Sequence, residues 1–520
     1  MLDQPSRLPG VPRLTWLHGA PSLAAGLFAV GTLFGACTAT LDFTECREDS
    51  DCSKFFADDK PMRCEDFQCV AGDGCANNSE CAGLGEGYVC TVIRTCVQAA
   101  SDHCAAPVYP DGMASDDVVL VGSLVAKDGP DAAVGEAVET AILQAVKDFN
   151  AATKLQSGKG VALVACDTKG NKDDAKLAAA HLGEALAVPA ILGPLADLEL
   201  GEVAQRVTLI NGVRAFTHSP LAAAELKFPD SDLVWQTQVA TRYQGAAIGA
   251  HLAAETANST FPGNPSTVML FNQVDSYGYA MYYAVATEET DGEINRIPQA
   301  GTQKISSYKL AEDGSTKLID YVDGNTEALI IVGGAEVADM LAAYKASGET
   351  WPKRVYIGPR SAAAVAALGD ATLSDSLRLI APDLGGEAAL AVQARVGETL
   401  PEVALAYDAT MATLLAMSGI AEGSAVTGPS IVKNMERLSN PDGLAISFGD
   451  DPKDFVRAAV DELARGADLQ ISGASGPLDY QDDGTICGEL TAFTFDGAAF
   501  VAAERFTPDC DKPTGTWSGN

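Results

Sequence analysis

Short β-branched runs alternate with amphipathic helical runs between residues 160 and 226, and this alternation constrains the fold more than any other feature. The order is strand, Asp turn, helix, strand, Gly-Pro, helix and strand. This alternation predicts a parallel sheet whose strands are connected by crossover helices. Ligands bind such sheets beyond the carboxyl ends of the strands. Asp167, Gly193 and Thr217 occupy those ends.

Composition predicts a soluble, acidic, globular chain. The 520 residues allow two to four domains, at about 150 residues each. An apolar content of 47% excludes a disordered chain. The 70 acidic residues outnumber the 35 basic ones, which gives a net charge of −35. This charge argues against nucleic acid and anionic membrane surfaces as partners, because both would repel the chain.

The N-terminus has the features of a bacterial export signal. Arg7 and Arg13 precede an apolar run over residues 20–36 that is short for a bilayer span and interrupted by proline and glycine. These features predict a signal peptide over residues 1–36 rather than a transmembrane helix. Residues 33–37 resemble a lipobox, although Phe34 stands where leucine is usual. We therefore expect lipidation of Cys37, with the membrane contacted only through that anchor.

A lipidated Cys37 places the protein in the bacterial cell envelope, on the periplasmic or extracellular face. The alternative is a plainly secreted protein in which Cys37 is an ordinary thiol.

Residues 37–106 are expected to form a disulfide-rich stalk with two repeats, over residues 46–69 and 75–96. The region has few large apolar residues and cannot close a core without cross-links. With Cys37 set aside, twelve cysteines remain. This even number favours disulfides, and the absence of CxxC spacings argues against zinc binding, the alternative. The pairing within each repeat stays open. The eight cysteines are Cys46, Cys52, Cys64, Cys69, Cys75, Cys81, Cys90 and Cys96.

Four further cysteines lie outside the repeats. Cys487 and Cys510 flank a segment with a central Asp-Gly step, which is a strong hairpin signal. We expect them to pair across the two strands. Cys104 and Cys166 remain, and the sequence leaves open whether they pair or either is free.

The chain resembles the type I periplasmic binding protein family, in the branch of leucine/isoleucine/valine-binding proteins and receptor ligand-binding regions. The resemblance rests on the order and spacing of several segments. They are residues 118–151, 160–226, 268–281, 329–348, 403–416 and 471–484.

The resemblance implies an α/β fold with two parallel-sheet, Rossmann-like lobes and three crossovers, preceded by the disulfide-rich module. A linker over 107–116 would lead into a binding domain over 117–506, and the tail over 507–520 is expected to be irregular. Lobe one would comprise residues 117–238 and 385–475. Lobe two would comprise residues 239–384 and 476–506.

In lobe one, the resemblance directs attention to two strand ends. The serine that helps hold a ligand carboxylate in amino-acid-binding members is absent after Gly193-Pro194, and Asp197 is the next polar residue. Asp197 could contact ligand or cap exposed amides. At the next strand end, Thr217 and Ser219 offer hydroxyls and His218 offers a donor or a pH-sensitive charge. The alternative for His218 is a solvated loop residue.

In lobe two, Tyr277 matches an aromatic that often lines the cleft of this family, and plain packing is the alternative. Arg360 stands where amino-acid-binding relatives carry an acidic residue for the ligand ammonium. An arginine suits a carboxylate or another planar anion instead. A surface position for Arg360 is the alternative.

The sequence favours a solute-binding protein over two other classes. It predicts a small polar or anionic ligand, with an ABC permease as a possible partner. The second class is an envelope sensor or partner-binding lipoprotein with the same two-lobed fold but no transport role. The third class, an envelope hydrolase, would need a nucleophile and base that the sequence does not offer. No motif indicates a metal or a cofactor, and the five histidines show no paired spacing.

Overall fold

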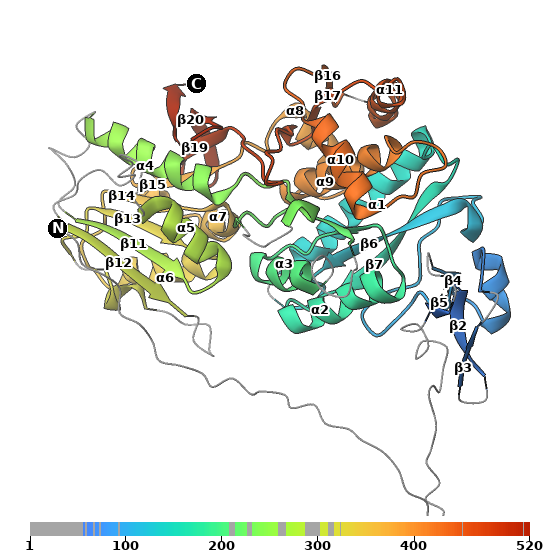
Figure 1. The fold of residues 1–520 in the computed structure, drawn as a ribbon. Helices are drawn as coiled ribbons and strands as arrows, with labels where there is room; N and C mark the ends of the chain where they lie inside the picture. The colour runs from blue at the N-terminus through green and yellow to red at the C-terminus, as the bar shows by residue number, and fades with distance from the viewer. Residues whose placement is uncertain are drawn as a thin grey trace, which may run out of the picture.

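The computed structural model describes residues 56–57, 60–65, 68–71, 74–91, 94–129, 131–206, 214–225, 231–257, 267–286, 302–309, 317–322, 324–449, 451–512 and 514–519. The predicted signal peptide, Cys37, Cys46 and Cys52 lie outside these residues, as do the side chains of Cys64 and Cys69. The described chain forms two α/β lobes side by side, with a small module on the end of lobe one far from lobe two (Figure 1). Among the described residues, no helix is both long and apolar enough to cross a membrane.

Lobe one is built on a parallel sheet in the strand order β10-β9-β8-β6-β7. Its residues are mostly buried because helices cover both faces. The helices α1 and α9 pack on one face, and α2 and α3 pack on the other. The strands are β6 (Val118–Val125), β7 (Gly160–Asp167), β8 (Ala190–Leu192), β9 (Phe216–Ser219) and β10 (Val234–Gln236). The helices are α1 (Ala132–Ala152), α2 (Lys172–Ala180), α3 (Asp197–Ala204) and α9 (Glu402–Ser418).

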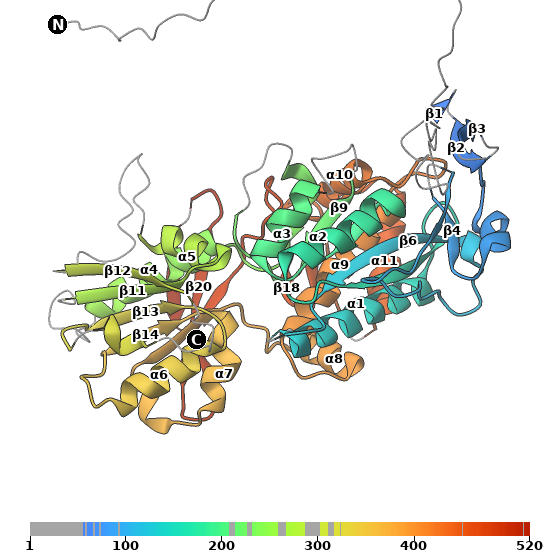
Figure 2. The same cartoon turned by 90° about the horizontal axis from the view of Figure 1, so that it is seen from below.

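A later part of the chain completes lobe one. Every residue of α9 after Glu402 is buried, which fits a helix that is apolar on all sides and central in the lobe. Further helices and a small sheet surround it (Figure 2). They are α8 (Glu387–Val396), α10 (Gly428–Leu438), α11 (Pro452–Ala464), β16 (Leu444–Ser447), β17 (Leu469–Gly473) and β18 (Gly476–Pro477).

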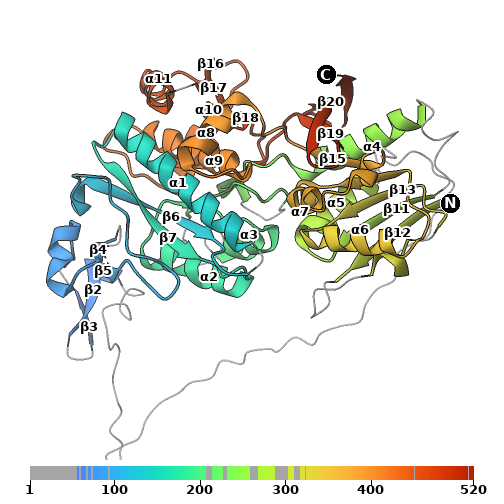
Figure 3. The same ribbon diagram turned by 180° about the vertical axis from the view of Figure 1, so that it is seen from behind.

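Lobe two contains a mixed sheet in the order β12-β11-β13-β14-β15-β19-β20-β21. The first five strands are parallel and the last three pair antiparallel. The helices α6 and α7 cover one face, and α4 and α5 cover the other (Figure 3). The strands are β11 (Thr267–Gln273), β12 (Thr302–Tyr308), β13 (Ala328–Val332), β14 (Arg354–Ile357), β15 (Leu377–Ala381), β19 (Leu490–Phe495), β20 (Phe500–Asp509) and β21 (Thr514–Gly519). The helices are α4 (Thr241–Ala257), α5 (Ser276–Ala286), α6 (Glu336–Ala346) and α7 (Ala362–Ala367).

The tail is not irregular as expected, because β20 continues to Asp509 and β21 adds an edge strand to the sheet of lobe two. Trp517 explains this order. Its ring packs on those of Phe506 and His251, and its Nε1 donates to the carbonyl of Ala247 at 3.2 Å. The tail therefore packs against α4 and helps to bury it.

The chain passes between the lobes three times, after β10, after β15 and after β18. The first and third connections are hydrogen-bonded to each other. Gln236 N donates to Gly484 O at 2.8 Å, and Ala240 N donates to Ile486 O at 3.2 Å. Arg242 adds an ion pair with Asp483 at 2.8 Å. Two of the three connections therefore form one bonded unit.

The Cys-rich module has two parts. A hairpin of β1 (Phe56–Ala57), β2 (Lys60–Glu65) and β3 (Gln68–Ala71) places the backbone of Cys64 opposite that of Cys69. In the second part, Cys75 pairs with Cys90 and Cys81 pairs with Cys96, around the strands β4 (Tyr88–Cys90) and β5 (Cys96–Gln98).

The segment after the module is bonded along the edge of β7. Ala105 N donates to Ala165 O at 2.8 Å, Val108 N donates to Leu163 O at 2.8 Å, and a disulfide joins Cys104 to Cys166. Cys487 is joined to Cys510 across the β19–β20 hairpin. The module and lobe one are therefore linked by backbone pairing and by a covalent bond.

Asp148 joins three helices of lobe one. It is 3% exposed and accepts two hydrogen bonds from Arg395 of α8, at 2.7 and 2.6 Å. Tyr407 of α9 donates a third at 2.9 Å, and Gln144 of α1 donates a fourth at 2.9 Å. This carboxylate is the polar centre of an otherwise apolar interface.

Asp148→Ala is expected to lower the free energy of unfolding by about 3 kcal/mol, because it leaves the Arg395 charge and the buried Tyr407 hydroxyl without their partner. Urea denaturation measures this change. Asp454→Ala is the matched control, since Asp454 pairs with Arg457 at 3.7 Å on an exposed surface and should change stability little. Equal losses in the two variants would contradict the interpretation.

Candidate functional site

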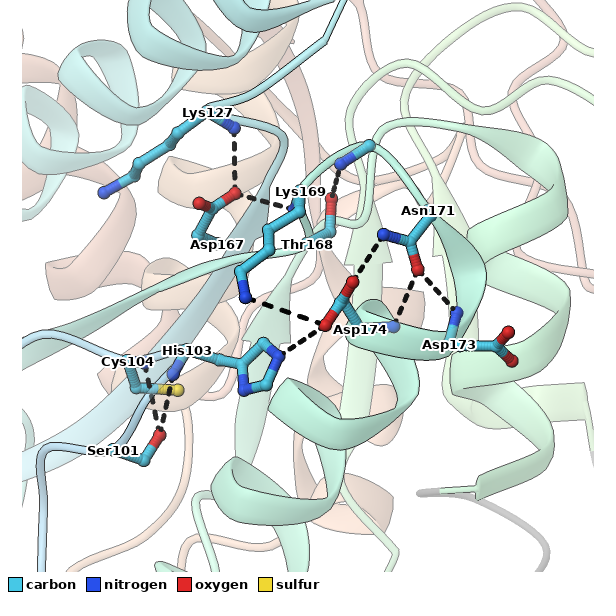
Figure 4. Close-up of polar contacts among 11 residues, drawn as sticks. Ser101, His103, Cys104, Lys127, Asp167, Thr168, Lys169, Asn171, Asp173 and Asp174 are labelled. Atoms are coloured by element: carbon cyan, nitrogen blue, oxygen red, sulfur yellow. Dashed lines mark hydrogen bonds and ion pairs between the residues drawn. The ribbon is translucent and has the colours of Figure 1, made fainter.

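The carboxyl ends of the lobe-one strands form one polar edge. Asp167, the last residue of β7, accepts hydrogen bonds at one oxygen from the backbone amides of Lys127 and Lys169, at 2.9 and 2.7 Å (Figure 4). Lys127 follows the end of β6, so Asp167 joins two neighbouring strand ends. Its bonded carboxylate therefore shapes the loops of this edge.

The same edge contacts the segment that follows the module. His103 Nε2 lies 2.7 Å from Asp174 Oδ1 in α2, and Figure 4 shows the two side chains pointing toward each other. Asn171 also donates to Asp174, at 2.5 Å. The hydrogen bond from His103 is the main cause that lowers the pKa of the Asp174 carboxyl. The segment after the module is thus joined to lobe one next to the polar strand ends.

Asp197 lies at the start of α3 and is 6% exposed. It does not cap its own helix. One carboxylate oxygen accepts from the backbone amides of Ala223 and Ala224, at 2.8 and 2.6 Å, and so fixes the loop after β9. Burial raises the pKa of the Asp197 carboxyl, against these hydrogen bonds and the nearby charge of Arg360. Asp197 therefore lies within electrostatic range of lobe two, where α3 also approaches α5.

The three residues at the end of β9 are fully buried. Ser219 Oγ donates to Pro194 O at 2.5 Å and accepts from Ala222 N at 3.1 Å. Thr217 Oγ1 has no hydrogen-bond partner in the part of the chain that the structure describes. Ser219 thus stabilises the loop after β8.

His218 connects lobe one to the interlobe connections. Its Nδ1 lies 2.9 Å from Thr413 Oγ1, whose proton goes to Ala409 O, so Nδ1 is the donor. Its Nε2 is then the acceptor, and it lies 2.9 Å from Thr237 Oγ1 and 3.1 Å from Tyr480 Oη, two hydroxyls that are also hydrogen-bonded to each other at 3.0 Å. Burial lowers the pKa of the His218 imidazole to about 3, so the ring is neutral at physiological pH. It is not a solvated loop residue.

Tyr277 and Arg360 lie together in lobe two. The Arg360 guanidinium lies 5.2 Å from the centre of the Tyr277 ring and donates to Asp275 Oδ2 at 2.9 Å. Tyr277 is 3% exposed, and its hydroxyl donates to Gln244 Oε1 at 3.0 Å. Arg360 keeps 37% of its side chain exposed. It is therefore a fixed, solvent-accessible cation close to Asp197.

The sequence did not predict a role for two further acidic residues near the facing surfaces, Asp275 in lobe two and Glu199 in lobe one. Asp275 precedes α5 and accepts from Gly278 N at 2.6 Å, an N-cap pattern that the Asp-Ser-Tyr-Gly sequence could have indicated. Glu199 lies in the first turn of α3, is 5% exposed and accepts from Thr168 Oγ1 at 3.2 Å. Burial raises the pKa of the Glu199 carboxyl to about 7, and the charges of Asp131 and Asp167 add to the rise.

In the described part of the module, three cysteine sulfurs lie close enough together to suggest a metal site but are all oxidised. Those of Cys75, Cys81 and Cys90 lie within 4.8 Å of one another, but each belongs to a disulfide and offers no thiolate.

The arrangement of two α/β lobes joined by three connections is the type I periplasmic binding fold. A family model described as "Periplasmic binding protein" matches residues 118–458, and the chain belongs to this family. Membership puts it among solute-binding proteins rather than enzymes and implies an extracytoplasmic location. No curated protein matches the chain.

Solved structures share the fold at low sequence identity. The leucine-binding protein LivK from Thermotoga maritima has a TM-score of 0.55 at 16% identity, over 75% of this chain and 99% of that one. LivJ from Streptococcus pneumoniae, in complex with isoleucine, has a TM-score of 0.54 at 16% identity, over 77% of this chain and 100% of that one. A solute-binding protein from R. palustris in complex with benzoate has a TM-score of 0.51 at 15% identity, over 74% and 95%.

Glu199 makes stability depend on pH. Its folded pKa of about 7 lies above the ordinary pKa of a glutamate carboxyl, 4.5, so the folded state binds more protons between these pH values. The stabilisation that the Glu199 carboxyl contributes is therefore fully present below pH 4.5. It is lost as the pH rises through about 7. Glu199→Gln should remove this loss, which amounts to about 3 kcal/mol at most. Urea denaturation at pH 5 and pH 8 measures it.

Glu422 is exposed, so Glu422→Gln serves as the control. Its free energy of unfolding should depend on pH as that of the wild type does. Parallel pH profiles for wild type and Glu199→Gln would rule out a titrating Glu199.

Proposed function

We propose that this protein is a lipid-anchored extracytoplasmic solute-binding protein that captures a small polar or anionic ligand between its lobes, for delivery to an ABC-type importer. Arg360 is the observation that carries the proposal. It is held by Asp275 and Tyr277 in lobe two, and it interacts electrostatically with Asp197 in lobe one. One accessible cation thus lies where the two lobes approach.

The hydrogen-bonding capacity of Arg360 favours an anionic group on the ligand. A guanidinium has five N–H donors, and the bond to Asp275 uses one of them. The others suit a carboxylate or another planar anion. Isoleucine and benzoate, the ligands in two of the similar structures, both carry a carboxylate. Tyr277 would support the guanidinium from below rather than cover the ligand, because its ring already packs against Arg360.

A ligand held by both lobes would stabilise their closed arrangement. Only interactions that differ between the open and closed states can shift that equilibrium. Arg360 in lobe two and Asp197 in lobe one are charged groups on opposite sides, and their interactions would change when the lobes close. His218 and Ser219 would act indirectly, because their hydrogen bonds hold the strand end and its loop in place. Thr217, whose Oγ1 makes no hydrogen bond in the described part of the chain, would act through packing alone. No cofactor takes part.

Arg360→Ala should weaken binding of an anionic ligand at least about tenfold, since a charge-assisted hydrogen bond contributes about 1.5–3 kcal/mol. A thermal-shift screen of the full-length protein against amino acids, dicarboxylates, amides, nucleosides and small sugars would find the ligand, and calorimetry would give the affinity. Asp275→Asn reports the sign of the ligand charge. It removes a negative charge beside Arg360, so it should spare or strengthen binding of an anion and weaken binding of a cation.

The control variant is Arg457→Ala, which removes an exposed arginine of α11 and should leave binding unchanged. A ligand that binds equally well to wild type and Arg360→Ala would contradict the role of Arg360.

Lipidation of Cys37 is tested separately. Cys37→Ser should shift the protein from the membrane fraction to the soluble fraction of its bacterial host, because two or more acyl chains are needed for stable anchoring. Fractionation and mass spectrometry of the mature N-terminus measure this. A mature wild-type protein with an unmodified Cys37, released in soluble form, would favour plain secretion.

An envelope sensor or partner-binding lipoprotein is the second candidate function. The attachment of the Cys-rich module to lobe one through Cys104–Cys166 favours it, since a module fixed in place could present a protein contact. This alternative expects no thermal shift across the panel and no permease or ATPase genes beside this one.

A further inference from the structure

A cavity of about 360 Å³ lies between the module and lobe one, at the opposite edge of the sheet from the polar strand ends. Four parts of the chain line it: residues of the second repeat, Asp116 with the start of β6, Lys159 before β7, and the segment 186–189 before β8. Its volume falls in the range of small-molecule sites, about 300–1,000 Å³. The family match begins at residue 118, so the wall from the module has no counterpart in the matched region.

The unequal lengths of two neighbouring strands leave room for this cavity. β6 begins at Val118, but β8 pairs with it only from Gly122 onward. The segment before β8 turns away from β6 at Ala187, whose φ of 54° is in the left-handed region. Among the described residues the start of β6 therefore has no strand neighbour on that side, and residues 118–120 line the cavity together with the module.

Two cations line the cavity. Arg94 comes from the module and Lys159 from the turn before β7, and neither has an ion-pair partner in the part of the chain that the structure describes. The acidic residue of the lining, Asp116, already accepts from Ser79 N at 3.1 Å. Two such cations at one cavity are unusual in a chain with twice as many acidic as basic residues.

Backbone hydrogen bonds hold the two turns that carry these exposed cations, and at Lys159 the carbonyl accepts from Leu155 N at 2.9 Å. The backbone of Arg94 donates to Thr91 O at 2.8 Å and accepts from Cys75 N at 3.0 Å, inside the turn closed by the Cys75–Cys90 disulfide. Asn78 links the module to the lobe, since it donates to Ser115 O at 2.5 Å and accepts from Cys90 N at 2.7 Å. The backbone around the cavity is therefore preorganised, which limits the entropy lost on binding to that of the two exposed side chains.

We propose that this cavity is a second ligand site, specific for a small anion that bears carboxylate or phosphate groups. Arg94 and Lys159 supply the charge, and the unpaired start of β6 supplies backbone hydrogen-bonding groups. The site is independent of the interlobe ligand, because Arg360 lies in the other lobe. Anion binding at the cavity would bridge the module and lobe one.

Calorimetry of the full-length protein at low ionic strength, with citrate and inorganic phosphate as probes, tests the proposal. We expect saturable binding of at least one probe with a stoichiometry of one. Arg94→Ala and Lys159→Ala should each weaken it at least tenfold. Added salt should weaken it as well, since the contact is ionic.

Three further variants separate the cavity from general surface charge and from the cleft. Lys154→Ala removes an exposed lysine near the same turn, outside the lining, and should not change binding. Arg360→Ala should not change it either. Ala76→Trp fills the cavity while keeping both cations, and should abolish binding.

Absence of saturable binding by both probes overturns the proposal. So does binding that survives Ala76→Trp or is insensitive to both Arg94→Ala and Lys159→Ala. Near-wild-type thermal melting of each variant, with its disulfides intact, confirms that a loss of binding does not come from misfolding.

Discussion

The structure depends on the contact between the first and third interlobe connections. Any closing motion must change the backbone of these connections, because they are two of the three links between the lobes. Their mutual hydrogen bonds, Gln236 to Gly484 and Ala240 to Ile486, make them bend together. His218 then joins both to lobe one through Thr237 and Tyr480. Because burial keeps this imidazole neutral, the hinge should keep the same bonding across the physiological pH range.

The same contacts connect the candidate ligand site to the hinge. Arg360 packs on the Tyr277 ring, and the Tyr277 hydroxyl donates to Gln244. Gln244 in turn donates to Val239 O, in the first connection, at 2.7 Å. A ligand that moves the guanidinium therefore acts on a side chain that is bonded to the hinge region. Contiguity of this kind gives a physical route for coupling, and double-mutant cycles between Arg360 and Gln244 would measure its energy.

Local patterns in the sequence were sufficient to predict the main elements. The alternation over residues 160–226 predicts β7, β8 and β9 with their crossover helices, and the Asp496-Gly497 step predicts the hairpin that separates Cys487 from Cys510. These predictions succeed because periodicity and turn chemistry are local properties. The resemblance to the binding protein family added the two lobes and their three connections.

Long-range contacts explain what the sequence left undecided. The partners of His218 lie 19, 195 and 262 residues away, so no local pattern could show that its ring would be buried at the hinge. Cys104 and Cys166 pair because the segment after the module aligns with the edge of β7, which its prolines did not suggest. The cavity beside Arg94 likewise results from the unequal lengths of β6 and β8.

The position of the module has a mechanical consequence. The module is bonded to lobe one through a disulfide, backbone pairing and the His103–Asp174 contact. In the described part of the chain, lobe two is joined to lobe one through the hinge and the facing surfaces, without a disulfide. Anything attached at the N-terminal side, a lipid anchor included, therefore acts on lobe one. Closure would then move lobe two relative to the anchored part, so the displacement that a permease or a partner protein could detect would be that of lobe two.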